Sequence, residues 1–316
     1  MLRRAKNLLP VNRPGAHSKA VMALSLISLT WGSTWMVSRK AVQYMPPLQL
    51  ASIRQLLAGS LFVLYYTRKK AVWPVGWEWV NIFILSLLNF LLTNGLTTWG
   101  VQYISGGLAA IIAAIFPLWL ILIGIFQDRT GLSFRAFAGF LLGFAGICLI
   151  FYDHLGDFLY PDFRFGIFIS LLASLTWAIA TIYTKKQAAR FNPYFSIGLQ
   201  MLISGALLYL ISLFSGRVIA IRDIPWQSWA GIGYLALVGS ALSYFAYLYA
   251  LQRLPAGQVS IYAYINPVVA VALGAVWLGE RLTLFIALGV LVTLYGVYLG
   301  STRKFEMHNG IGFVEK

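Results

Sequence analysis

Long apolar blocks alternate with short polar connectors along the whole of this 316-residue chain. A block of about 20 apolar residues crosses the ~30 Å hydrocarbon core of a bilayer as a helix. The blocks are too long and too uniformly apolar to be the short alternating strands of a membrane barrel. The pattern predicts an all-α membrane protein with ten spans, at about 20–38, 48–66, 79–99, 106–126, 136–152, 166–184, 194–214, 228–249, 259–278 and 283–300.

The pattern occurs twice. Leu-Thr-Trp at 29–31 returns at 175–177, an offset of 146 residues. The same offset relates further positions in the two halves, which are Pro47 to Pro193, Arg54 to Gln200 and Gly59 to Gly205. An offset of 150 relates Gly107, Pro117, Gly124 and Gly139 to Gly257, Pro267, Gly274 and Gly289. The chain is therefore predicted to hold two tandem copies of one unit.

Five spans in each copy have a geometric consequence, because an odd number inverts the second copy relative to the first. Inverted repeats are related by a pseudo-two-fold axis in the membrane plane, and their substrate site lies near the midplane between the halves. The predicted organisation is an N-terminal tail over 1–19, a first repeat over 20–152, an external loop over 153–165, a second repeat over 166–300 and a C-terminal tail over 301–316.

Composition supports the membrane assignment. Hydrophobic residues make up 59% of the chain and charged residues only 10%, with a mean hydropathy of +0.77. Soluble domains carry roughly 25% charge. The net charge of +15 does not indicate nucleic-acid binding, because the basic residues lie in the connectors. The protein is predicted to contact the lipid bilayer and no nucleic acid.

The basic residues also predict the orientation. With both termini in the cytoplasm, the inner segments hold 17 of the 24 Lys and Arg residues and the outer segments hold 6. This bias follows the positive-inside rule, although Arg39 and Lys40 go against it. The first apolar run has no small-residue cleavage site after it, so it is expected to stay as a span. We expect a multi-pass protein of the cytoplasmic membrane with both termini cytoplasmic.

Acidic residues and histidines are missing from the middle of the predicted spans, since all nine acids and all three histidines fall in connectors, tails or span edges. A proton-driven carrier usually keeps an intramembrane carboxylate or histidine. Coupling must therefore use an edge group, use the substrate's own charge, or be absent. The chain has no P-loop, no metal-ligand spacing and no nucleophile elbow. We therefore expect the protein to have no catalytic residues, no metal and no cofactor, and we expect that it is not an enzyme.

Arg54 is the single charge well inside a span, roughly 10 Å from Pro47 along the helix. One interpretation is a ligand for a substrate carboxylate, or a gate partner. The other is an arginine that extends to the interface and braces the helices. The second copy has the uncharged Gln200 at the equivalent position, which favours the interpretation that Arg54 braces the helices.

Aromatic and amide residues inside the spans are the other candidates for a pocket. Such groups combine apolar contact with a few polar anchors. Helix-to-helix contacts or an interfacial aromatic belt would explain them equally well. The predicted substrate-binding residues are Trp31, Trp35, Arg54, Asn94, Trp99, Tyr244, Tyr247, Tyr262 and Asn266.

Two prolines occupy matched positions in the middle of the fourth and ninth spans. Pro117 and Pro267 each free a backbone carbonyl and bend a helix. With glycines nearby, they are candidate hinges for alternating access. A fixed kink that serves packing is the alternative.

A set of short motifs recurs in order along the chain: Trp31-Gly32-Ser33-Thr34-Trp35, Pro47 with Arg54, Gly107 to Pro117, Gly257 to Pro267, and Gly279-Glu280-Arg281-Leu282-Thr283. In these motifs the chain resembles the EamA-type exporters of the drug/metabolite transporter superfamily. The resemblance implies ten helices, a central cavity, and export of amino acids, related metabolites or drugs. One departure is Gln127-Asp128-Arg129 in the first copy, where Gly-Glu-Arg is expected.

The functional prediction is a secondary transporter that exports a small amphiphilic metabolite by alternating access. A passive facilitator or channel for small metabolites is the first alternative, and an intramembrane lipid-modifying enzyme is the second. The expected partners are a small-molecule substrate and the bilayer, and a homodimer is left open.

Overall fold

The computed structural model describes residues 16–128, 134–152, 154–187, 192–254, 259 and 262–301. Over these ranges the regular structure is helical, which confirms the predicted all-α fold. The first repeat contains α1 (Ala16–Ala41), α2 (Pro47–Arg68), α3 (Trp77–Leu85), η2 (Ser86–Gly95), α4 (Leu96–Gly100), α5 (Gly106–Ala113), α6 (Phe116–Asp128) and α7 (Phe134–Tyr152). Here α3, η2 and α4 form the third span, and α5 with α6 forms the fourth.

The second repeat follows a short 3₁₀ turn, η3 (Asp157–Leu159). Its elements are α8 (Pro161–Gln187), α9 (Pro193–Phe214), η4 (Ile221–Asp223), α10 (Trp226–Ala236), η5 (Leu237–Leu242), α11 (Ser243–Leu251), α13 (Tyr262–Leu278) and α14 (Leu284–Ser301). Here α10, η5 and α11 form the eighth span. Pro47 and Pro193 open α2 and α9 at matched positions, because a proline fits the first turn, where no intrahelical N–H bond is lost.

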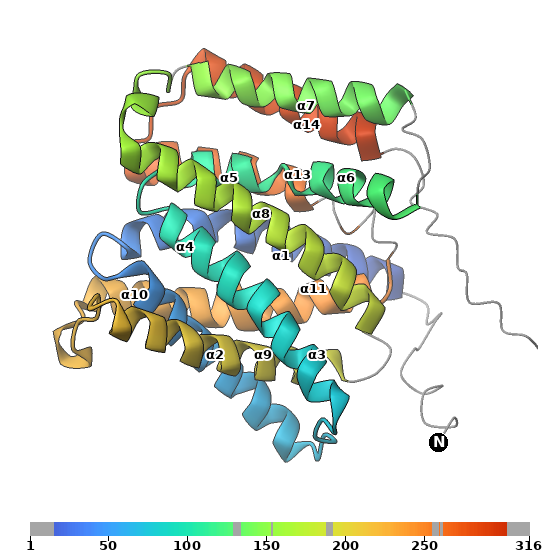
Figure 1. Ribbon diagram of the computed structural model, residues 1–316, viewed down its shortest axis with the longest axis vertical. Coiled ribbons are helices and arrows are strands. Elements are labelled where there is room, and N and C mark those ends of the chain that lie inside the picture. Colours follow the sequence, from blue (N-terminus) through green and yellow to red (C-terminus); the bar gives the residue numbers. More distant parts are fainter. Residues whose placement is uncertain are drawn as a thin grey trace, which may run out of the picture.

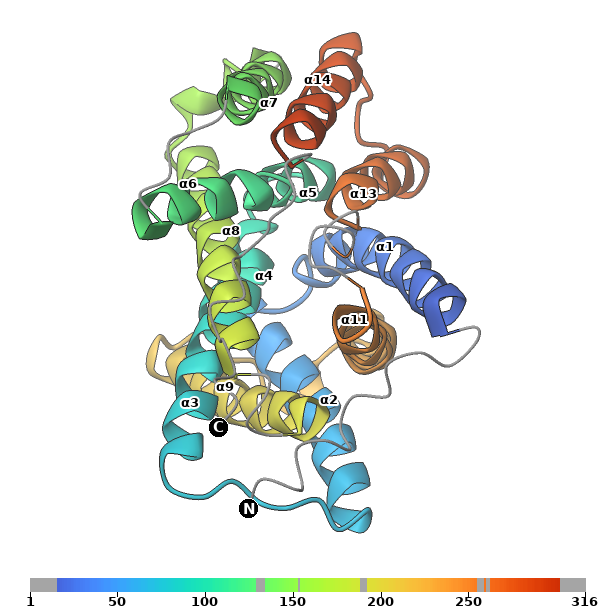
Figure 2. The same ribbon diagram turned by 90° about the vertical axis from the view of Figure 1, so that its right-hand side faces the viewer.

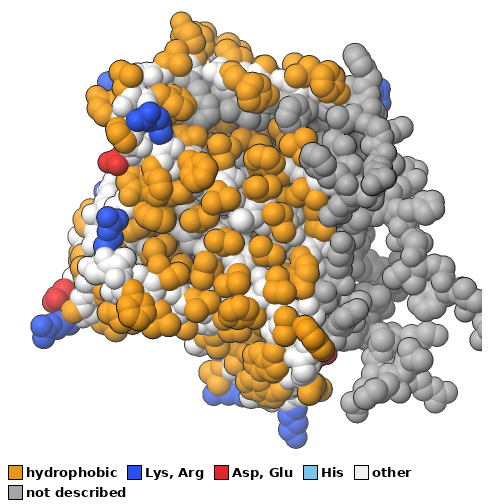
Figure 3. Space-filling view, viewed as in Figure 1, with side chains coloured by type: hydrophobic (Ala, Val, Ile, Leu, Met, Phe, Trp, Pro, Cys, Tyr) orange, Lys and Arg blue, Asp and Glu red, His pale blue; other side chains and the backbone are white. Residues whose placement is uncertain are grey.

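Six helices in the described ranges are long and apolar enough to cross a membrane, and the other four spans are shorter apolar helices. The face in Figure 3 is covered by hydrophobic side chains, with its Lys, Arg, Asp and Glu at the margins. Exposed residues of α7 and α14 such as Phe144 and Leu291 are apolar, at 58% and 64% exposure. A water-facing surface would be polar, so this surface fits contact with lipid.

The helices pack in pairs that the repeat relates to one another. The second spans, α2 and α9, lie along each other, and so do the fifth spans, α7 and α14. In the first repeat α1 packs against α11 and α13, and its counterpart α8 packs against α4, η2, α5 and α6. Figures 1 and 2 place α1 and α8 between the α7–α14 pair and the α2–α9 pair. Each first span therefore packs mainly against spans of the other repeat, at the centre of the bundle.

Glycine allows the close approach of α7 and α14. A Cβ atom on Gly146 would collide with the backbone of Thr293 and lie 2.7 Å from the carbonyl oxygen of Gly289. Small residues of this kind let membrane helices approach through their backbones.

Three spans depart from regular α-helix. The third and eighth contain the π-helical segments η2 and η5 at corresponding places in the two repeats. The fourth is broken at 114–115, and Pro117 lies in the first turn of α6 and not in the middle of a helix as expected. Pro267, by contrast, lies inside the continuous helix α13. The two matched prolines thus occupy different local structures.

Candidate functional site

A cavity of about 140 Å³ lies at the centre of the bundle. Its wall comes from both repeats, with α1, α2, the third and fourth spans, α8, α11 and α13 all contributing. Seven of the nine predicted substrate-binding residues line it, namely Trp31, Trp35, Arg54, Asn94, Tyr244, Tyr262 and Asn266. A water molecule needs about 10–15 Å³ of such space, so the cavity has room for on the order of ten non-hydrogen atoms.

Trp31 is the centre of an aromatic cluster at one end of this cavity. Its ring lies 5.0 Å from that of Tyr262, 5.4 Å from that of Tyr244 and 6.2 Å from that of Trp177. Two indole nitrogens are anchored: Trp31 Nε1 donates to the Gly239 carbonyl at 3.1 Å, and Trp177 Nε1 donates to the Tyr262 hydroxyl at 3.0 Å. The rings are therefore held by hydrogen bonds as well as by contact.

Trp177 is a cavity residue that our sequence analysis did not propose. It is the counterpart of Trp31 at the offset of 146, and the two rings meet edge to face at 88°. Residues near the axis of an inverted repeat face their own counterparts. The repeat therefore contained the signal, because a cavity role for Trp31 implies one for Trp177.

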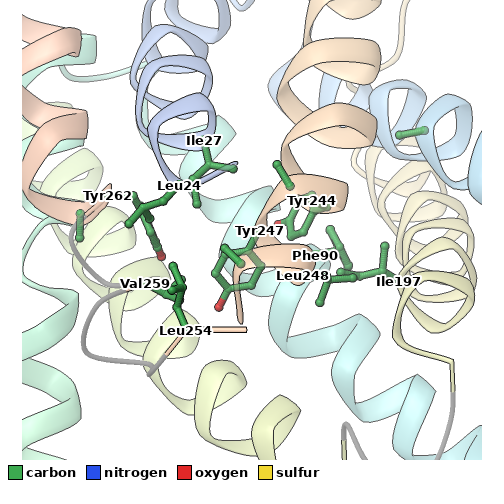
Figure 4. Close-up of a cluster of buried hydrophobic side chains, with 14 of the residues drawn as sticks. Leu24, Ile27, Phe90, Ile197, Tyr244, Tyr247, Leu248, Leu254, Val259 and Tyr262 are labelled. Carbon is green, nitrogen blue, oxygen red and sulfur yellow. The ribbon is translucent and has the colours of Figure 1, made fainter. Parts of the chain in front are cut away.

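Two predicted residues lie outside the cavity lining. Tyr247 is a buried member of the aromatic cluster, with its ring 5.3 Å from that of Trp31. Figure 4 shows Tyr247 and Tyr244 on the same helix, with Tyr262 on a neighbouring segment and Phe90 beside Tyr244. Trp99 packs against Phe165, ring to ring at 5.1 Å. Both therefore make packing contacts and do not line the cavity.

The two amides in the lining also join helices. With its amide nitrogen as donor, Asn266 of α13 bonds to the Ser28 carbonyl of α1 at 2.8 Å and to the Tyr262 carbonyl at 3.1 Å. The Asn94 oxygen lies 3.4 Å from Gln55 Nε2, which also donates to the Phe90 carbonyl at 3.2 Å. Asn94 and Asn266 thus brace the helices at the cavity wall.

Arg54 is 6% exposed and lines the cavity. Its Nε donates to Ser240 Oγ at 2.9 Å, and its Nη2 donates to the Gly239 carbonyl at 3.3 Å. Both acceptors belong to η5, where the helix is π-helical and its carbonyls are displaced from regular α-helical bonding. The guanidinium is therefore held by the eighth span and does not extend to the interface.

Small hydroxyl residues complete the wall. Ser170 and Ser174 lie one turn apart on α8, on the same face as Trp177, and all three line the cavity. The two serines are 7% and 4% exposed, and neither hydroxyl has a hydrogen-bond partner among the described residues. Sequence analysis missed them because serine is common in membrane helices, where it usually bonds to its own backbone.

A second polar arrangement lies where α1 ends and α5 begins, which we call the distal end of the bundle. Glu280 follows α13, and its carboxylate oxygens accept from the backbone amides of Gly106 at 3.0 Å and Gly107 at 3.2 Å. Arg39 Nη1 donates to the carbonyls of Val101 and Gln102, both at 2.7 Å.

These two side chains bind opposite ends of neighbouring spans. The carboxylate lies at the positive N-terminus of α5, and the guanidinium lies at the negative C-terminal end of the third span. We call the pair Arg39 and Glu280 the distal clamp. It links α1, the third and fourth spans, and the α13–α14 turn, and it gives Arg39 a structural reason to depart from the charge bias. In the first repeat the segment that corresponds to Glu280 is Gln127-Asp128-Arg129, of which Arg129 lies outside the described residues. Gly257, which corresponds to Gly107 in the second repeat, also lies outside them.

The model of the EamA-like transporter family matches the chain twice, over residues 18–152 and 164–302. The chain belongs to the EamA-like transporter family. Its EamA relatives include the uncharacterized inner membrane transporter YedA of Escherichia coli (strain K12), 30% identical over 289 residues that cover 90% of each chain. The uncharacterized transporter YvbV of Bacillus subtilis (strain 168) is 26% identical over 310 residues, or 95% of this chain and 97% of its own.

A solved crystal structure extends the comparison to the EamA fold. It covers 89% of this chain and 96% of its own, with a TM-score of 0.66 at 16% identity, which shows a shared fold alone. Membership confirms the resemblance seen in the motifs, and it confirms that this EamA protein is a membrane transporter and not an enzyme. Among the described residues, no cluster of His, Cys, Asp and Glu could hold a metal ion.

Proposed function

We propose that this EamA protein is a secondary transporter that exports a small amphiphilic molecule across the cytoplasmic membrane by alternating access. The observation that carries the proposal is the cavity between the inverted repeats, lined by aromatic rings and a few fixed polar groups. Transporters built from such repeats bind their substrates at this place. Cavities that bind small molecules have this mixture of apolar and polar lining.

Both termini lie in the cytoplasm in this proposal, in keeping with the charge bias. The distal clamp then faces outward, and it holds the outer ends of four spans together. Opening to the outside requires the Glu280 carboxylate to leave the amides of Gly106 and Gly107. The break at 114–115 before Pro117, together with Pro267 in α13, supplies bending points in the two spans that would move.

A passive facilitator is the second candidate, and one observation favours it. The cavity is lined by no Asp, Glu or His among the described residues, so these residues offer no buried proton relay. The two candidates differ in their energy source and not in the path.

The test is a metabolite profile of cells with and without the protein, inside the cells and in the medium. We expect at least one small amphiphilic metabolite to accumulate inside cells that lack the protein and to leave on re-expression. Collapse of the proton gradient should stop uphill export by a coupled transporter, and it should leave downhill flux through a facilitator unchanged. Identical profiles with and without the protein would contradict both candidates.

A further inference from the structure

The buried guanidinium of Arg54 has no acidic partner among the residues that the structure describes. Ion pairs among the described residues join His154 to Asp157 and Arg222 to Asp223, both outside the cavity. Two of the five N–H donors of Arg54 have acceptors, and both lie on the Nε–Nη2 edge. The opposite edge, between Nη1 and Nη2, has no acceptor within the described part of the chain. A buried cation without a counterion is costly, so something must offset that cost.

The second repeat shows what packing alone requires at this position. Gln200 is the counterpart of Arg54, and it contacts the third span as Arg54 contacts the eighth. Its Oε1 accepts from Asn89 of η2 at 2.9 Å, and its Nε2 donates to Ser196 at 2.9 Å. Both polar atoms of the neutral Gln200 amide are therefore hydrogen-bonded at this helix contact. Gln200 does not line the cavity. Bracing does not require the charge that Arg54 carries.

Two serines of α8 offer a second sign of a missing polar ligand in the same cavity. The hydroxyls of Ser170 and Ser174 line the cavity and are more than nine-tenths buried, and neither has a hydrogen-bond partner in the part of the chain that the structure describes. Buried polar groups in proteins almost always have hydrogen-bond partners, so exceptions point to a ligand or a water. A hydroxyl can donate to an oxyanion as a guanidinium does.

We propose that the transported molecule is a small organic acid whose carboxylate binds the free Nη1–Nη2 edge of Arg54. This edge presents two parallel N–H groups, which match the two oxygens of a carboxylate. The apolar part of the acid lies against the rings around Trp31, and the cavity volume limits it to roughly ten non-hydrogen atoms. The inference rests on the proposed function, because it names the class of molecule that the same cavity carries.

The test uses purified full-length protein in detergent and three acids of suitable size, benzoate, phenylacetate and hexanoate, each beside its primary amide. The readout is the rise in Tm with ligand concentration, which gives an affinity because a ligand that binds the folded state stabilises it. We expect at least one acid to raise Tm and its amide to have little effect. Arg54→Gln, which copies the second repeat, should weaken acid binding by roughly 10- to 100-fold.

Two further variants make the result specific. Arg54→Lys keeps the charge and loses the two-pronged geometry, so its affinity should lie between those of the wild type and Arg54→Gln. Arg222→Gln removes an equally charged side chain from the exposed surface and should leave binding unchanged. If Arg54→Gln destabilises the fold itself, its Tm without ligand will be lower than that of the wild type. In that case the affinity of Arg54→Lys for the acid decides whether Arg54 binds the carboxylate.

Three outcomes overturn the inference. They are equal stabilisation by acid and amide, undiminished acid binding by Arg54→Gln, and no stabilisation by any of the three acids. The proposed function fails separately, when cells with and without the protein export the same metabolites. If the amides bind and the cells export a metabolite, the cavity remains the proposed transport site, but the proposal that Arg54 binds a carboxylate is wrong.

Discussion

Replacement of Glu280 by glutamine tests the distal clamp directly. In the wild type both carboxylate oxygens accept a backbone N–H, one from Gly106 and one from Gly107. The Glu280→Gln side chain has the same length but only one oxygen, and its NH₂ group would face an N–H donor. The change therefore removes one hydrogen bond and the negative charge at the N-terminus of α5, with almost no change in volume.

The magnitude follows from these losses. A hydrogen bond to a charged group contributes about 1.5–3 kcal/mol, and a charge at a helix N-terminus contributes about 0.3–1 kcal/mol. Glu280 is partly exposed, and glutamine keeps one neutral bond, so we expect a net loss of about 1–3 kcal/mol. If the clamp is broken in the outward-open state, the loss applies only to the closed state. The ratio of open to closed molecules should then rise by about 5- to 150-fold.

The assay measures access to the cavity from outside the cell. Ser38 lines the cavity on α1, near the distal end, and a cysteine is close to serine in size. Cys148 is exposed and has to be replaced by alanine first. A membrane-impermeant thiol reagent added outside should modify Ser38→Cys several-fold faster in the Glu280→Gln background than in the wild type.

Arg281→Gln is the matched control, since it removes a neighbouring charge that is exposed and belongs to no described ion pair. It should not change the rate at Ser38→Cys. An unchanged rate in Glu280→Gln at equal expression, or an equal increase in Arg281→Gln, would refute the clamp as a gate. Slower modification of Ser38→Cys in the Glu280→Gln background would mean that the clamp contacts stabilise the outward-open state instead of the closed state.

Two more predictions address packing and topology. Gly146→Ala should destabilise the protein by about 1–3 kcal/mol, because its Cβ meets the backbone of α14, whereas Gly233→Ala has open space and should not lower Tm. Thermal unfolding of both purified variants in detergent checks this, and equal Tm values would contradict the close contact. A reporter fused after Lys316 and another in the segment before α8, at 154–160, should lie on opposite sides of the membrane. Finding both on one side would overturn the inverted-repeat topology.

Much of the fold could be predicted because the membrane imposes a simple rule on the sequence. Apolar length alone placed the second span at 48–66 and the seventh at 194–214, against helices Pro47–Arg68 and Pro193–Phe214. The same rule could not reveal the break at 114–115, since both sides of it are equally apolar. It also could not reveal η2 and η5, whose carbonyls accept hydrogen bonds from side chains on other helices.

The face on which a residue lies was the harder question. A helix that is apolar all round has no stripe to separate the side that faces a cavity from the side that faces lipid. Spacing therefore grouped Tyr247 with Tyr244, although only Tyr244 lines the cavity. Trp99 was proposed as an aromatic residue within the third span, yet it packs against Phe165. Both assignments depended on tertiary neighbours that the sequence does not identify.

The repeat itself separates packing from function more sharply than any single residue does. Where both copies use equivalent contacts, as in α2 with α9 and α7 with α14, the contacts satisfy requirements shared by both halves. Where the copies differ, shared packing cannot be the whole cause. Arg54 replaces the glutamine that suffices at Gln200, and the fourth span is broken where α13 is continuous around Pro267. The first difference puts a charge on the cavity wall and the second puts a bend beside it. An inverted pair with identical halves would bind and open alike on both sides, so these differences are where direction and substrate choice can arise.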